Sequence, residues 1–80
     1  MLSNTTLLTT VQRTCDGRLL TGKIELPSPV VFGLSLGDVR AQNLFWANVR
    51  SQMCLEEDKT YVLIKYYVME EADLQRRVAV

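Results

Sequence analysis

The chain has no histidine among its 80 residues. Histidine is the usual general base near neutral pH and the commonest metal ligand, so its absence argues against catalysis and against a metal site. The carboxylates are adjacent in the chain, as Glu56-Glu57-Asp58 and Glu70-Glu71, and adjacent side chains diverge rather than converge on a substrate. A nucleophile elbow and a glycine-rich phosphate loop are also missing. We therefore expect no enzyme activity, no metal, no cofactor and no small-molecule substrate.

Cysteine is scarce, with only Cys15 and Cys54 present. Their separation fits no metal-ligand spacing, and we interpret both as free thiols in a reducing compartment. Cys15 lies next to the acidic Asp16, which disfavours a thiolate. Cys54 falls late in an amphipathic segment, where we expect a small packing residue. Neither cysteine is predicted to act as a nucleophile.

Long apolar runs are absent, and none approaches the ~20 residues that a helix needs to cross a bilayer. The first residues also lack the basic start and apolar stretch of a signal peptide. We expect a soluble, cytoplasmic protein with no membrane partner. This expectation includes assembly into a virus particle inside a host cell.

Net charge is absent too, because nine basic residues balance nine acidic ones. No long-range field therefore steers the protein toward nucleic acid or an anionic surface, and no net repulsion keeps copies apart. Eighty residues, 48% of them hydrophobic, predict one small globular domain spanning residues 1–80. Such a domain has a thin stability margin, which association commonly improves.

The most hydrophobic stretch runs from Tyr61 to Met69 as Y-V-L-I-K-Y-Y-V-M, with Lys65 as its single charge. Its aromatic and β-branched residues predict a strand. Strict alternation would place Tyr61, Leu63, Tyr67 and Met69 with Lys65 on one face and Val62, Ile64, Tyr66 and Val68 on the other. A strand that is apolar on both faces is either interior to a sheet or presents one face to a partner.

Asp16-Gly17 predicts a hairpin between residues 7–14 and 19–26, with a two-residue type I′ turn. This turn places Cys15 opposite Arg18 and Leu7 opposite Leu26. One face of the hairpin is then mostly apolar and the other mostly polar, as expected for a hairpin that packs on one side.

After the hairpin, Pro27-Ser28-Pro29 ends the second strand. Val30-Val31-Phe32 then forms either a brief edge strand or, as we favour, a connector that covers one end of the core, and Gly33 opens a turn. An amphipathic helix follows over residues 38–55, with Ser35 or Asp38 as its N-cap, and should stop before the acids at 56–58. Its main apolar stripe contains Val39, Phe45, Trp46, Val49 and Met53.

Leu44 and Leu55 lie on the opposite side of this helix and are either a second, weaker contact face or isolated exposed leucines without a function. The last residues, 70–80, fit either a short helix or, as we favour, a strand that folds back on residues 63–69. The fold class is therefore α+β: a small, mostly antiparallel sheet, made of an N-terminal hairpin and one or two C-terminal strands, with one helix on one face. T-G-K-I-E-L at residues 21–26 resembles the second strand of ubiquitin, and this resemblance implies a β-grasp-like arrangement without the conjugating C-terminal glycines.

These features predict a non-catalytic protein–protein interaction module, such as a small accessory, inhibitor or structural-assembly protein of the kind that phages carry. Its partner is another protein or a second copy of itself. The predicted contact residues are Tyr61, Leu63, Tyr67, Met69, Leu44 and Leu55, because Tyr, Met and other large side chains gather on the helix and the last clear strand. The alternative is a small nucleic-acid-binding protein that uses Arg13, Arg18 and Lys23 of the hairpin and the tyrosines of the sheet.

Overall fold

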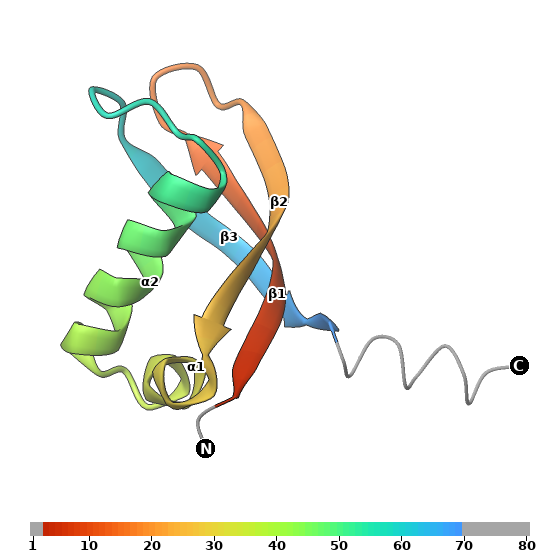
Figure 1. Cartoon of the computed structure of the whole chain (residues 1–80). Helices are drawn as coiled ribbons and strands as arrows, with labels where there is room; N and C mark the ends of the chain where they lie inside the picture. Colours follow the sequence, from red (N-terminus) through yellow and green to blue (C-terminus); the bar gives the residue numbers. More distant parts are fainter. Residues whose placement is uncertain (1–2, 70–80) are drawn as a thin grey trace, which may run out of the picture.

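The computed structural model describes residues 3–69 (Figure 1). The strand or helix predicted for residues 70–80 lies outside the described residues. In chain order the elements are β1 (Asn4–Arg13), β2 (Leu19–Pro27), α1 (Ser28–Ser35), α2 (Val39–Gln52) and β3 (Tyr61–Val68).

The three strands form one antiparallel sheet in the order β2-β1-β3. This arrangement confirms the predicted α+β class, whereas the β-grasp resemblance is not confirmed. Among the described strands β1 is the central one, and β3 lies at an edge although its sequence is apolar on both faces. Of the two positions predicted for residues 61–69, the interior one is therefore taken by β1, and β3 is an edge strand.

The hairpin of β1 and β2 forms as predicted, but its register differs by two residues. Leu7 lies opposite Ile24 rather than Leu26. The cause is a four-residue loop, 14–17, closed by a hydrogen bond of 2.8 Å from the Arg13 N–H to the Arg18 carbonyl. Asp16 holds this loop by accepting from the Arg18 N–H at 3.1 Å, and Gly17 supplies a positive φ of 74°. A shift of two residues leaves every side chain on its predicted face.

Residues 28–35 form the helix α1, which corrects the predicted connector or edge strand. Pro29 lies in the first turn of α1, where its missing N–H has no intrahelical acceptor to lose. Gly33 belongs to α1 as well, so it does not open a turn. A Cβ placed on Gly33 would lie 2.8 Å from the Ala41 Cβ, so the missing side chain lets α1 approach α2. Val30, Val31 and Leu34 pack on the core, which confirms that this segment covers it.

Helix α2 begins at the predicted N-cap, because the Asp38 carboxylate accepts from the Arg40 N–H at 2.8 Å. It ends at Gln52, ahead of the acids, with Met53 as its C-cap. Cys54 follows in the left-handed region at φ 54°, and the Leu55 N–H returns to the Arg50 carbonyl at 3.0 Å. This is the Schellman pattern with cysteine where glycine is usual. Cys54 is therefore an exposed turn residue and not the small packing residue that we expected.

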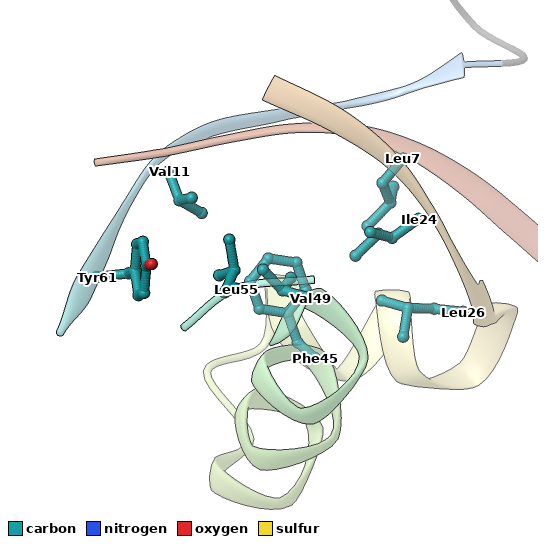
Figure 2. Packing of buried hydrophobic residues seen from close by; sticks show 8 residues of the cluster. All are labelled: Leu7, Val11, Ile24, Leu26, Phe45, Val49, Leu55 and Tyr61. Carbon is teal, nitrogen blue, oxygen red and sulfur yellow. The ribbon is translucent and has the colours of Figure 1, made fainter. Parts of the chain in front are cut away.

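The core lies between the sheet and α2 (Figure 2). From α2, Phe45 and Val49 are buried and Trp46 and Met53 are partly buried, as the helical stripe predicts. Val39, which the same stripe includes, is 67% exposed because it sits in the first turn, away from the sheet. The buried hydrophobic cluster consists of Leu7, Val11, Ile24, Leu26, Phe45, Val49, Leu55 and Tyr61.

Neither helix among residues 3–69 combines the length and the apolar character that spanning a membrane would require.

Candidate interaction surface

Strand β3 contains a bulge that redistributes its side chains between the two faces of the sheet. Val11 pairs with Leu63 and Thr10 pairs with Lys65, so Ile64 is an extra residue. Residues before and after the bulge therefore reach the same face although their numbers differ in parity. Tyr61, Leu63, Tyr66 and Val68 lie on the α2 side with Val11, and Val62, Lys65 and Tyr67 lie on the outer side. The strict alternation predicted for residues 61–69 is wrong beyond Leu63.

Helix α2 lies over β2 rather than over β3. Its backbone comes close to β2 and makes no close approach to β3. Its side chains Phe45 and Val49 pack in the core with residues of all three strands. The α2 side of β3 is therefore covered only by the side chains that reach toward it, chiefly Phe45 and Trp46. A cleft of about 430 Å³ remains between α2 and β3. Its lining residues are Leu34, Gln42, Phe45, Trp46, Tyr61, Val62, Leu63 and Tyr66.

Four apolar side chains of β3 are exposed on the described part of the chain. Val62 is 43% exposed, Leu63 37%, Ile64 47% and Tyr67 52%. They follow one another along one strand but lie on both faces of the sheet, and the ammonium group of Lys65 lies 5.6 Å from the ring centre of Tyr67. We call these four residues the β3 strip. Exposed apolar side chains gathered along an edge strand are typical of a contact surface.

The backbone of β3 also has free hydrogen-bonding groups at its outer edge. The Thr14 N–H donates to the Thr60 carbonyl at 2.9 Å, which fixes the ladder between β1 and β3. By the alternation of an antiparallel ladder, Val62, Lys65 and Tyr67 bond to β1, and the groups of Tyr61, Leu63, Tyr66 and Val68 point away from it. Within residues 3–69 no hydrogen bond reaches these outward groups.

The other edge of the sheet, on β2, is closed by comparison. Because Arg13 and Arg18 form a bonded pair, the outward groups of β2 belong to residues 19, 21, 23, 25 and 27. Pro27 has no N–H to offer. The Gln52 side chain occupies both groups of Glu25: its Oε1 accepts from the Glu25 N–H at 2.7 Å and its Nε2 donates to the Glu25 carbonyl at 2.9 Å. Nε2 also donates to Asn48 Oδ1 at 2.9 Å, which orients the amide.

Three of the six predicted contact residues lie on or next to β3 and are accessible. Leu63 and Tyr67 belong to the β3 strip, on opposite faces, and Met69 follows β3 and is half-buried. Leu44 is exposed but separate from them. It lines a second, shallower cleft of about 260 Å³ between α1 and α2, together with Pro29 and Val30.

The other two predicted contact residues are buried. Leu55 is part of the core, where it follows the Schellman turn. Tyr61 is 7% exposed; its hydroxyl accepts from the Glu56 N–H at 3.2 Å, and the Arg50 guanidinium lies 5.6 Å from its ring centre. Both side chains are engaged inside the fold and do not contribute to an accessible surface.

The structure adds four residues that the sequence did not identify as part of this region. Val62 and Ile64 were assigned to a packed face, but Val62 lies on the outer side of the sheet and Ile64 is the extra residue of the bulge. Gln42 lines the cleft and Gln52 closes the β2 edge. A single amide side chain on a helix has no sequence signal for pairing with a strand, so Gln52 was not predictable.

Arg13, one of the three basic residues of the alternative, nucleic-acid hypothesis, is paired within the fold. Arg13 bonds Asp16 at 2.7 Å and Glu56 at 2.9 Å, and the hydrogen bond to Asp16 raises its pKa. The same hydrogen bond lowers the pKa of Asp16 to about 2. Arg50 donates to the carbonyls of Glu56 and Lys59 at 3.4 and 3.5 Å. Arg13 and Arg50 thus both have partners within the fold.

Residues 3–69 contain no group of three acidic, cysteine or histidine side chains placed to hold a metal ion. Cys15 and Cys54 are both exposed, on the hairpin loop and on the turn after α2.

Comparisons of the chain with protein-family models, with curated proteins and with solved structures found no match.

Proposed function

We propose that the protein is a non-catalytic interaction module that binds an extended polypeptide along the outer edge of β3. The observation that carries this proposal is that the backbone of α2 approaches β2 and not β3, which leaves the cleft and Leu63 accessible on the α2 side of the sheet. An added strand would bond the outward groups of Tyr61, Leu63, Tyr66 and Val68. Alternate side chains of that strand would enter the cleft beside Trp46.

This mode of binding explains why a strand with one charge among its eight residues lies at an edge. Edge strands of monomers are usually protected by charges, proline or a covering element. The described part of β3 carries only Lys65 and the bulge. A module of this kind suits a small accessory, inhibitor or assembly protein. Two exposed free cysteines suit the reducing conditions of the cytoplasm.

Panning a displayed library of random peptides against the purified chain tests the proposal. We expect enrichment of peptides with alternating apolar residues, because such peptides match the pleat of an added strand. The Leu63→Glu variant should lose this binding, since it places a carboxylate at the mouth of the cleft.

Leu36→Glu is the matched control, because it makes the same change at a residue that is 70% exposed in the turn between α1 and α2. It should leave peptide binding unchanged. Thermal unfolding of both variants verifies that each is folded. Failure to enrich any peptide, or equal binding by folded Leu63→Glu and the wild type, would refute a docking site on β3.

A further inference from the structure

The two edges of the sheet differ in a way that defines how copies of this chain can pair. On β2, Pro27 has no donor, Gln52 occupies both groups of Glu25, and Lys23 places a charge beside the remaining groups. On β3 the outward groups are accessible among the described residues and lie beside apolar side chains. A copy that approaches edge to edge therefore meets a β3 edge lined by apolar side chains and, among the described residues, a β2 edge that is free of these obstacles only at residues 19 and 21.

We propose that the polypeptide bound by β3 is the β3 strand of a second copy, and that Gln52 limits the assembly to two chains. The inference rests on the proposed function, since it names the occupant of that edge. Two antiparallel β3 strands related by a twofold axis would give a six-stranded sheet in the order β2-β1-β3-β3-β1-β2. Both clefts would open along the joint, where α2 of neither copy covers the sheet.

Charge and symmetry support a second copy as the occupant. Nine basic and nine acidic residues leave no net charge to repel an identical molecule. The β3 strip carries the same apolar character in both copies, so it is complementary to itself, as a twofold interface requires. Lys65 is the single charge of the strand, and a pairing register that sets it opposite any other residue of β3 avoids direct repulsion.

Gln52 matters because a free β2 edge would allow a different assembly. If β2 of one copy could pair with β3 of another, each added chain would present a fresh edge, and the assembly would grow without closing. The amide of Gln52 covers that edge near its C-terminal end, where it bonds both backbone groups of Glu25 as a neighbouring strand would. Pairing of β3 with β3 uses up the accessible edge of both copies and therefore stops at two.

Sedimentation velocity over a range of concentrations, with the full chain, tests the inference. The wild type should shift from one to twice the mass of the chain as concentration rises. Leu63→Pro should stay at the mass of one chain, because the Leu63 N–H points away from β1 and its loss removes an outward donor without breaking the ladder. Leu19→Pro, the same change on an outward position of β2, should still form the dimer. Leu63→Lys provides a second edge variant if Leu63→Pro does not fold.

The double variant Gln52→Ala with Lys23→Thr should form species larger than two chains, because it opens the β2 edge at residues 23 and 25. Adding Leu63→Lys to it should suppress these species. A wild type that stays at the mass of one chain at every concentration would overturn the inference of a second copy. If that same wild type still binds peptides, and Leu63→Glu loses this binding while Leu36→Glu keeps it, the proposed function stands. A dimer that persists in folded Leu63→Pro and Leu63→Lys would place the interface elsewhere, and a double variant no larger than two chains would refute the role of Gln52.

Discussion

The hydroxyl groups of Thr10 and Thr21 are hydrogen-bonded across β1 and β2 at 2.9 Å. Thr9, one residue earlier on β1, points to the opposite face, is fully buried, and has no hydrogen-bond partner for its Oγ1 among the described residues. Two adjacent threonines therefore contribute differently to stability. One hydroxyl is satisfied on the outer face, and the other is enclosed in the apolar core beside Leu7 and Val11.

Thr9→Val should stabilise the protein, because it replaces an unsatisfied buried hydroxyl by a methyl group of similar size. We expect the free energy of unfolding to rise by about 1 kcal/mol. Urea denaturation monitored by Trp46 fluorescence measures this change. Thr10→Val is the matched control and should lower stability, since it removes the bond to Thr21. An equal response of the two variants would contradict this account of the pair.

Gly33→Ala should destabilise the protein, although alanine favours helices. The new Cβ would lie 2.8 Å from the Ala41 Cβ, and neither atom can move without shifting a helix. We expect a loss of about 1–2 kcal/mol, because overpacking outweighs the helical gain. Gly22→Ala is a useful comparison, since its Cβ would meet the flexible Met53 side chain at 3.1 Å, and thermal denaturation should show a smaller loss.

Cys54→Gly should raise stability by about 1 kcal/mol, because glycine has no Cβ to strain at a left-handed position. The φ of 54° at Cys54 sets this expectation. Chemical denaturation under reducing conditions provides the measurement. Cys54→Ser removes the thiol but keeps the Cβ, so it should bring no gain; an equal gain would trace the effect to the thiol rather than to the backbone.

The Asp16 carboxylate should stabilise the hairpin loop in a pH-dependent manner. Its pKa falls from 3.8 to about 2 in the folded protein, mainly through its hydrogen bond with Arg13 and then through that with the Arg18 N–H. A lowered pKa contributes stability that is present above 3.8 and lost as the pH falls through about 2. Asp16→Asn should therefore be less stable than the wild type near neutral pH, and the difference in urea denaturation should shrink at the acidic end. A difference that stays constant across this range would contradict the ion pair.

Much of the architecture followed from patterns that a single sequence carries. The alternation of residues 7–12 and 19–26 predicts which hairpin face packs, and the observed register preserves it because the shift is two residues. The loop length was not predictable, since it depends on how Asp16 bonds Arg18 and Arg13. The start of α2 was predicted correctly from Asp38, because a carboxylate at an N-cap accepts a hydrogen bond from a nearby free N–H, here that of Arg40.

Errors arose where tertiary contacts override local preference. Val30-Val31-Phe32 is β-branched and aromatic, yet it is helical because Pro29 suits a first helical turn and Gly33 allows α1 to pack on Ala41. The bulge at Ile64 has no marker in the sequence, so the faces of β3 were assigned by strict alternation. The exposed apolar residues of β3 were consequently predicted by strand but not by face.

Hydrogen–deuterium exchange of the β3 amides, measured at low and at high protein concentration, tests the central claim most directly. The account predicts that the outward amides of Leu63 and Tyr66 exchange fast in the dilute sample and become protected on association, whereas the free Thr21 amide on β2 does not change. Protection that appears at residues of α1 and α2, with no change on β3, would contradict a binding edge on β3. Protection of these β3 amides in a dilute sample whose mass is that of one chain would show that the chain itself covers the edge.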